Sequence, residues 1–115
     1  MHVVHYLTEN GVDIFQDWLD SLRDMKAKVA VLRRIDRLRS GNPGDHKACR
    51  EGVAELRCDV GPGYRVYYFI HGNMVVVLLC GGDKSSQRHD IARAVACKKD
   101  FLRRMALEME DIAHE

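Results

Sequence analysis

Three cationic residues lie where they could act together on a phosphate group. Arg57 and Arg65 stand on two successive segments in which side chains alternate between two faces, and Lys84 closely follows a third segment that is apolar throughout. Arg57 and Arg65 belong on the same open side of a sheet, because an unpaired guanidinium is costly to bury. Lys84 is then expected at the rim of that surface. The three cations predict a surface that binds phosphates.

The same alternation brings further residues to this side of the sheet. Glu55, Tyr67 and Phe69 share it, and the polar loop before the sheet contributes Lys47 and Arg50. Cations hold phosphates while exposed rings stack on unpaired bases, at about 1 to 3 kcal/mol each, so the surface suits single-stranded nucleic acid. The alternative is that Tyr67 and Phe69 lie beneath a helix as ordinary core. Burial preferences alone do not decide between the two.

Seven segments with regular periodicity must position these residues. Strands are predicted at 2–7, 53–59, 64–70 and 74–80, and helices at 14–22, 26–40 and 87 to past 102. This order, β-α-α-β-β-β-α, predicts an α+β domain in which an antiparallel sheet packs on a hairpin of the first two helices. The segment 74–80 is apolar on both faces and is expected to be the most buried strand.

The composition of the chain limits the classes of protein to which it can belong. With 115 residues, 46% of them apolar, the chain 1–115 is expected to form a single domain. No apolar run is long enough to cross a bilayer and the N-terminus has no signal pattern, so a cytoplasmic protein without membrane partners is expected. Four cysteines without paired spacing argue against a zinc site.

Charge is distributed unevenly along the chain. All 18 Lys and Arg residues lie between Arg23 and Arg104, whereas residues 1–22 and 105–115 contain only acidic charges. Such an asymmetry suggests a body that binds a polyanion, although a solvated helix face is the commoner explanation of a single run of charges.

Several motifs, in order, resemble the RelE/ParE toxin superfamily, and most closely its phage-derived Gp49-like, HigB-type branch. The similarity covers residues 1 to about 98. The motifs are Phe15-x-x-Trp18-Leu19-x-x-Leu22, Arg37-Leu38-x-x-Gly41-Asn42-x-Gly44-Asp45-x-Lys47, Glu55-Leu56-Arg57, Gly61-Pro62-Gly63-Tyr64-Arg65-Val66-Tyr67-Tyr68, and Val75 to Leu79 followed by Gly81-Gly82-Asp83-Lys84-Ser85-Ser86-Gln87.

The resemblance implies a RelE-like fold and the toxin of a bacterial type II toxin–antitoxin module. Such a toxin enters the ribosome and cuts mRNA during translation. It is held inactive by a cognate helix-turn-helix antitoxin, HigA-like in this branch, and the complex binds operator DNA through the antitoxin. A non-catalytic RNA-binding or interaction module and a ParE-like inhibitor of DNA gyrase are the alternatives, and the shared fold does not distinguish them.

The resemblance also implies roles for individual residues. Arg65 would stabilise the phosphorane-like transition state, Arg57 would supply a second cation, and Lys84 would protonate the leaving 5′ oxygen. Arg88 joins Lys47, Arg50 and Tyr67 as a candidate RNA-binding residue. No carboxylate cluster is expected to hold Mg²⁺, so the predicted cleavage by the 2′-OH of RNA needs neither metal nor cofactor.

Two departures from the RelE-like pattern leave the general base open. The tyrosine that ends the pattern is replaced by the neighbourhood of Arg88, His89 and Asp90, and Glu55 stands where a lysine is expected. His89 and Glu55 are therefore the candidate bases, although a histidine on a helix surface is more often without a catalytic role.

The acidic segment 105–115 extends beyond the family resemblance. Leu102, Met105, Met109 and Ile112 are spaced as one stripe of a helix. That stripe could contact an antitoxin or a second copy of the chain. A helix that packs on its own domain, or a frayed end, is an equally good interpretation.

Overall fold

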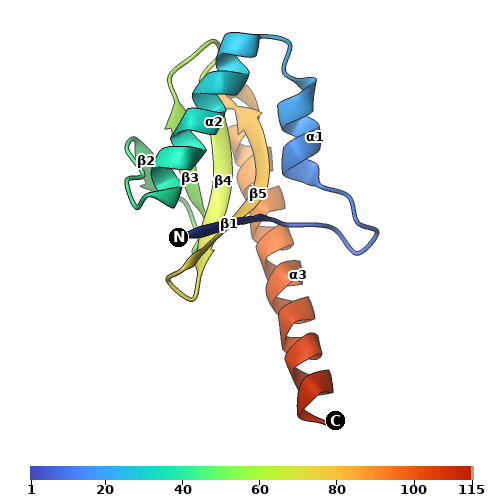
Figure 1. Cartoon of the computed structure of the whole chain (residues 1–115). Helices are drawn as coiled ribbons and strands as arrows, with labels where there is room; N and C mark the ends of the chain where they lie inside the picture. The colour runs from blue at the N-terminus through green and yellow to red at the C-terminus, as the bar shows by residue number, and fades with distance from the viewer. Residues whose placement is uncertain (115) are drawn as a thin grey trace.

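A five-stranded sheet with helices on both faces forms the body of the protein (Figure 1). The computed structural model describes residues 1–114. Its elements are β1 (His2–His5), α1 (Ile14–Ser21), α2 (Met25–Arg39), β2 (His46–Ala48), β3 (Ala54–Cys58), β4 (Tyr64–His71), β5 (Val75–Asp83), the 3₁₀ turn η1 (Lys84–Ser86) and α3 (Gln87–Ala113).

The strand order β1-β5-β4-β3-β2 confirms the predicted α+β class and meander. The strands from β2 to β5 pair antiparallel, and β1 pairs in parallel with β5. Strand β2 was not expected, because its three residues are all exposed and carry no alternation of apolar and polar side chains. It adds an edge to the sheet beside β3, within the segment predicted to be a loop.

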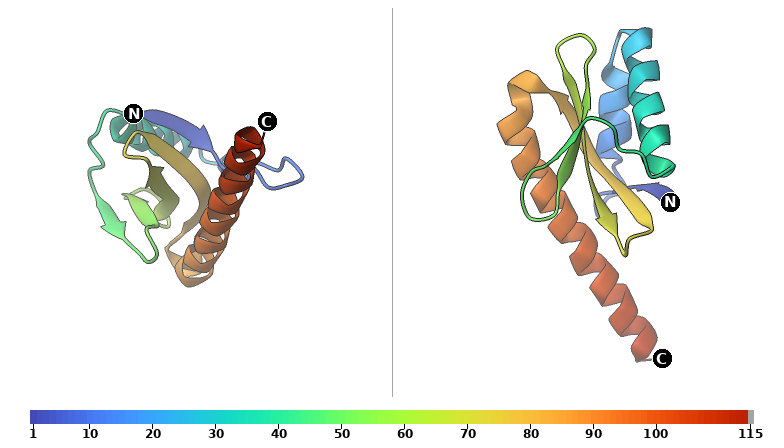
Figure 2. Two further views of the ribbon diagram at one scale, coloured as in Figure 1. Left: turned by 90° about the horizontal axis from the view of Figure 1, so that it is seen from below. Right: turned by 90° about the vertical axis from the view of Figure 1, so that its left-hand side faces the viewer.

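Helices α1 and α2 cover one face of the sheet, as the sequence predicts (Figure 2, right). The side chain of Asp13 accepts a hydrogen bond from the Gln16 N–H at 2.9 Å, which caps the start of α1. Buried side chains from the two helices pack against alternate residues of the strands. These are Phe15 and Leu19 of α1, Val31, Ile35 and Leu38 of α2, and Leu56, Val66, Tyr68, Val76 and Leu78 of the sheet.

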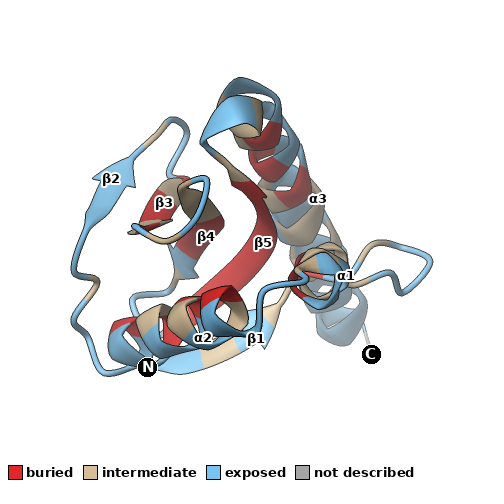
Figure 3. Ribbon diagram, turned by 90° about the horizontal axis from the view of Figure 1, so that it is seen from above, coloured by how far each residue is buried: buried red, intermediate tan, exposed pale blue. Residues whose placement is uncertain are grey.

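Helix α3 covers much of the opposite face, and this corrects the prediction that Tyr67 and Phe69 lie on an open surface. Tyr67 is 0% exposed and Phe69 3%, and both pack in one cluster with Ala94 and Val95 of α3. The alternation along β4 is as predicted. The helix nevertheless covers these two rings, because its own apolar side must be buried. Figure 3 shows α3 lying beside β5, with buried residues along the helix.

The two ends of this face differ because α3 crosses only part of it. Arg65 and Arg57 lie at the end of the sheet where α3 begins, beyond the part that the helix covers most tightly. At the other end α3 runs past the sheet and projects away from the body (Figure 1). The molecule is accordingly 50 Å long and only 27 by 24 Å across.

Candidate functional site

The three predicted cations share one hollow. Arg57, Arg65 and Lys84 line a cavity of about 330 Å³ at the ends of β3, β4 and β5. Arg57 lies directly opposite Arg65 in the β3–β4 pairing, so the register of the sheet sets the two guanidinium groups side by side. The remaining lining residues are Asp45, Asp59, Gly61, Pro62 and Gly63.

The turn between β3 and β4 forms one wall of this hollow. Gly61 and Gly63 adopt φ angles of +57° and +81°, in the left-handed region that other residues rarely occupy. The chain therefore reverses tightly, and Arg65 follows at the start of β4. A side chain at Gly61 or Gly63 would strain the turn whose geometry fixes the position of Arg65.

Arg65 is held in place from two sides. Its Nη1 donates to the carbonyl oxygens of Gly63 and Tyr64, each at 3.3 Å, and its Nε lies 3.9 Å from Oε2 of Glu55. The side chain is 13% exposed. Within residues 1–114 its Nη2 takes part in no hydrogen bond, so this nitrogen remains free to donate to a ligand in the hollow.

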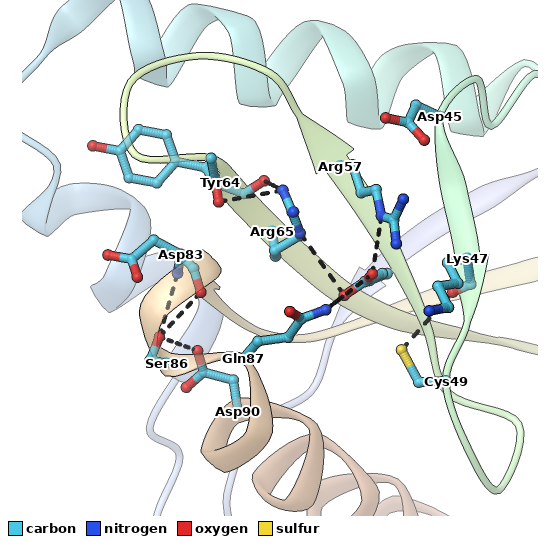
Figure 4. A network of polar contacts seen from close by, with 12 residues as sticks. Asp45, Lys47, Cys49, Arg57, Tyr64, Arg65, Asp83, Ser86, Gln87 and Asp90 are labelled. Atoms are coloured by element: carbon cyan, nitrogen blue, oxygen red, sulfur yellow. Dashed lines mark hydrogen bonds and ion pairs between the residues drawn. The ribbon is translucent and has the colours of Figure 1, made fainter.

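Glu55 lies beneath both arginines as a fully buried carboxylate. Its Oε1 accepts a hydrogen bond from Nε of Arg57 at 3.1 Å, and Nε2 of Gln87 donates to both of its oxygens, at 2.9 and 3.2 Å. Figure 4 shows the side chains of Arg57, Arg65 and Gln87 converging on one point. With 0% exposure and all of these donors, Glu55 is placed to position the arginines.

This geometry does not fit the predicted role of Glu55 as a general base. A base needs an oxygen within reach of the hydroxyl that it deprotonates, and both oxygens of Glu55 already accept hydrogen bonds from Arg57 and Gln87. A buried carboxylate that is left unpaired is costly. The sequence placed Glu55 on the correct face but did not reveal that it would be buried under two cations.

A second hollow lies on the other side of Glu55. Lys47 and Arg50 line it together with Gln87 and Ile91, and its volume is about 260 Å³. Lys47 of β2 is the residue that pairs with Glu55 in the sheet register. The structure therefore separates the predicted cations into two neighbouring groups with a buried carboxylate between them.

Tyr67 cannot stack on a base in this structure. Its ring is covered by α3, and its hydroxyl is buried without a hydrogen-bond partner among residues 1–114. Burial raises the pKa of the phenol well above its usual range. The prediction that Tyr67 binds RNA is therefore wrong. The alternative given by the sequence, that the ring belongs to the core under a helix, is correct.

His89 and Arg88 lie outside both hollows. Each is exposed near the start of α3, whereas Gln87 and Ile91, one turn apart, face the second hollow and the buried Asp90 faces the sheet. Because His89 follows Gln87 by two positions, it points to the opposite side of the helix. The structure does not bring His89 to the arginines.

Several residues of the site were missed by sequence reasoning. Gln87 was placed only as the start of a helix, and Asp45 and Asp59 were not considered as parts of the surface. Arg34 of α2 was not considered either: its Nη2 donates to the carbonyl oxygens of Pro43 and Asp45, at 2.6 and 2.9 Å, and its Nη1 to that of Arg57. Arg34 thus fixes the loop before β2 against β3.

The hollow next to Arg65 contains carboxylates as well as cations. Asp45 and Asp59 line it, and the backbone N–H of Arg57 donates to the Asp45 carbonyl at 2.9 Å. Within residues 1–114 no three His, Cys, Asp or Glu side chains are grouped so that they could hold a metal ion. No helix in the same range is both long and apolar enough to span a bilayer.

The fold and the site define a class of protein: a small α+β domain with a cationic hollow at one end of its sheet. Residues 17–99 match the family model of the phage-derived Gp49-like proteins (DUF891). The chain belongs to this family, which is the RelE/HigB-type toxin family. Membership in this family indicates that the protein is the toxin of a toxin–antitoxin module, and it implies an antitoxin partner.

The chain is also similar to a protein of comparable size. An uncharacterized protein of Haemophilus influenzae is 49% identical over 80 residues, which cover 70% of this chain and 81% of the relative.

Proposed function

We propose that the protein is an endoribonuclease of the HigB type that cuts mRNA on the ribosome, in the cytoplasm, as the toxin of a type II module. The observation that carries this proposal is the hollow in which Arg57, Arg65 and Lys84 meet. Two of the three cations are held by a buried carboxylate, which is the preorganisation that transition-state stabilisation requires.

Arg65 is proposed to stabilise the charge that develops on the phosphate. Its Nη1 is fixed by backbone carbonyls and its Nε faces Glu55, so Nη2 is left to donate into the hollow without a cost of reorganisation. Arg57 is 33% exposed and uses only its Nε on Glu55, so it can hold the same phosphate from the neighbouring strand.

Lys84 is proposed to be the general acid. It follows β5 at the rim of the hollow, its side chain is exposed, and no hydrogen bond within residues 1–114 involves its ammonium group. It can therefore approach the leaving 5′ oxygen of a bound strand and give up a proton.

Asp45 is proposed as the general base in place of His89 and Glu55. It lines the same hollow as the three cations, and its carbonyl oxygen accepts hydrogen bonds from Arg34 and from the Arg57 N–H. Its backbone is therefore fixed beside Arg57. Asp59 also lines the hollow and serves as the comparison, because it follows β3 in the exposed turn.

Lys47 and Arg50 are proposed to hold the RNA strand next to the cleaved bond. They line the second hollow, separated from the first by Glu55 and Gln87. Cations spaced along a groove bind a phosphate backbone without selecting its sequence. A HigA-like antitoxin with a helix-turn-helix domain is proposed to block this surface.

To test this proposal, the purified protein is added to a bacterial translation extract and the ends of the mRNA are mapped. Gyrase supercoiling is measured in parallel. The proposal expects cuts that appear only during translation and are lost with Arg65→Ala. Asp45→Asn is expected to slow cleavage on the order of a hundredfold, at the lower end of the range for a general base, and Asp59→Asn to leave it nearly unchanged.

Two results would contradict this proposal. Inhibition of supercoiling with intact mRNA would identify a gyrase inhibitor. Binding of RNA without cleavage would identify a non-catalytic module.

A further inference from the structure

One buried acid takes no part in the proposed cleavage. Asp90 lies in the first turn of α3 and is 5% exposed. Within residues 1–114 its carboxyl group has one hydrogen-bond partner, the hydroxyl of Ser86, which donates to Oδ2 at 2.5 Å. A carboxyl group in a protein interior is costly unless its partners replace the lost water. A hydrophobic residue would fill the same place at lower cost, so stability does not account for an acid at this position.

The end of β5 is shaped to receive this carboxyl group. A Cβ atom at Gly82 would overlap Oδ2 of Asp90 and would lie 2.9 Å from Oγ of Ser86, so no side chain fits there. On the opposite face of the sheet, a Cβ atom at Gly81 would overlap the ring of Trp18. The two consecutive glycines thus let α1 and α3 approach the last residues of β5 from both sides.

Ser86 connects Asp90 to the turn that contains Lys84. The Oγ of Ser86 accepts a hydrogen bond from the Asp83 N–H at 3.3 Å, and the Asp83 carboxylate accepts one from the Ser85 N–H at 2.8 Å. These bonds close η1 as a capping box closes the start of a helix. Figure 4 shows the contacts that run from Asp83 through Ser86 to Asp90. The Asp90 carboxyl group therefore holds η1 against the first turn of α3.

The turn η1 lies beside Arg65. In the pairing of β4 with β5, Gly82 is opposite Arg65, and Lys84 follows two residues later. The Cβ atom of Lys84 is 3.6 Å from the position that a Cβ atom at Gly63 would occupy, so Lys84 begins next to the turn that precedes Arg65. The side chain of Lys84 is exposed. The place from which it enters the hollow is therefore set by the backbone of η1.

We propose that Asp90 and Ser86 are positioning residues for Lys84. The inference rests on the function proposed above, in which Lys84 protonates the leaving 5′ oxygen. Asp90 fixes Ser86, Ser86 fixes η1, and η1 sets where the Lys84 side chain begins relative to the phosphate held by Arg65. Neither Asp90 nor Ser86 is among the residues that line the hollow, so both act through Lys84 and not on the substrate.

Two adjacent residues thus fasten the start of α3 to two different buried acids. Ser86 donates to Asp90, and Gln87 donates to Glu55, which holds the arginines. The two acids have separate tasks in this arrangement, because Glu55 orients the groups that stabilise charge and Asp90 orients the group that delivers a proton. Loss of Asp90 or Ser86 should therefore affect only the step that needs the proton.

The test measures single-turnover cleavage of two mRNAs on the ribosome. One mRNA is ordinary, and the other carries sulfur in place of the leaving 5′ oxygen at the bond that end mapping identifies. A thiol has a pKa of about 8.5, so a thiolate leaves without being protonated and a general acid gives it little advantage. A variant that acts through the acid therefore slows cleavage of the ordinary mRNA and not of the sulfur-containing one. Lys84→Ala shows the full size of this difference.

Ser86→Ala should slow cleavage of the ordinary mRNA roughly tenfold, less than the hundredfold that a misplacement of about 1 Å can cost, because the flexible Lys84 side chain recovers part of the loss. Its rate on the sulfur-containing mRNA should stay within about twofold of the unmodified protein. In a Lys84→Ala background Ser86→Ala should have no further effect. Ser85→Ala is the matched control, since its exposed hydroxyl bonds Asp83 and not Asp90, and both rates should be unchanged.

Two further variants separate this role from an effect on folding. Asp90→Asn keeps an oxygen that can accept from Ser86, so it should cleave the ordinary mRNA at nearly the unmodified rate. The double variant Ser86→Ala/Asp90→Ala removes both partners at once, which leaves neither of them buried and unpaired. It should show the same loss as Ser86→Ala. Thermal unfolding checks that each variant is folded at the temperature of the assay.

Different results would overturn different steps of the inference. Equal slowing of both mRNAs by Ser86→Ala would mean that Asp90 and Ser86 support the fold and not the acid. An unchanged rate on the ordinary mRNA would mean that η1 presents Lys84 without them. If Lys84→Ala slows both mRNAs equally, or if the unmodified protein cuts neither, the function proposed for Lys84 or for the hollow is wrong, and the inference is wrong with it.

Discussion

Two carboxylate–arginine clusters lie on the α3 side of the sheet, one at each end of the body, and they differ in what the arginines do. Glu55 is fully buried under Arg57 and Arg65, whose remaining nitrogens face a hollow. At the other end Asp100 accepts hydrogen bonds from Tyr6, at 2.6 Å, and from Arg103 and Arg104.

The second cluster joins elements instead of preparing a site. Nη2 of Arg104 also donates to the carbonyl oxygen of Leu7, and its guanidinium lies over the ring of Tyr6. Two of its nitrogens, Nε and Nη2, are thus bonded within the protein, and they tie α3 to the chain that follows β1. The comparison shows that an arginine next to a carboxylate is not by itself evidence of function. What distinguishes Arg65 is that it lines a hollow together with two further cations, Arg57 and Lys84.

Among the variants that test this comparison, Glu55→Gln is expected to have the largest effect on stability and cleavage. Loss of the charge leaves Arg57 and Arg65 without their anchor, so the free energy of unfolding should fall by roughly 3 kcal/mol, at the low end for a broken buried pair because both arginines are partly exposed. Cleavage should fall as well, since the arginines lose their fixed orientation. Chemical denaturation and cleavage rates of the folded variant measure the two effects separately. Unchanged cleavage would show that Glu55 positions nothing.

Tyr6→Phe should have a smaller effect, on stability alone. It removes the hydrogen bond to Asp100, which is worth on the order of 1 kcal/mol. This bond and its neighbours hold the pKa of Asp100 at about 2, below its usual value of 3.8. A carboxyl group whose pKa is lowered by folding stabilises the folded state above about pH 4. This contribution to the free energy of unfolding is lost as the pH falls towards 2.

The unmodified protein and Tyr6→Phe should therefore differ in stability near neutral pH and become similar in stability in acid. Urea denaturation of both at pH 7 and at pH 2 measures this. Equal stability at pH 7, or a difference that is undiminished at pH 2, would contradict the role given to the cluster. Cleavage should be the same in both at neutral pH, in contrast to Glu55→Gln.

The smallest effect is expected from Tyr67→Phe, and its sign is informative. In the described part of the chain the buried Tyr67 hydroxyl has no hydrogen-bond partner, so its removal should leave stability unchanged or raise it by about 1 kcal/mol. Thermal unfolding of the variant is the measurement. A clear loss of stability would mean that the hydroxyl has a hydrogen-bond partner in solution. A loss of RNA binding would mean that Tyr67 is accessible to RNA after all.

Alternation along the strands predicted most of this arrangement. It assigned Arg57, Arg65 and Glu55 to one face of the sheet, and in the structure the neighbouring Leu56 and Val66 pack in the core on the other face. Helix periodicity predicted that α1 and α2 cover the second of these faces. Both patterns are local, so a single sequence is sufficient to find them.

Coverage by α3 could not be predicted in the same way. Whether Tyr67 is open or buried depends on the direction in which α3 crosses the sheet, and no local pattern records that direction. The burial of Glu55 depends on Gln87, which is 32 residues away and donates to it from the start of α3. Long-range polar partners of this kind have no periodic signal, which is also why the sequence does not reveal that His89 lies outside both hollows.

The most direct test of the central claim is the single-turnover rate at which Arg65→Ala cleaves an mRNA on the ribosome, compared with the unmodified protein. Loss of one preorganised donor, worth about 2.7 to 4 kcal/mol, should slow cleavage on the order of a hundredfold or more, while ribosome binding changes little. Cleavage at an unchanged rate would contradict the assignment of Arg65, and with it the function proposed for the hollow.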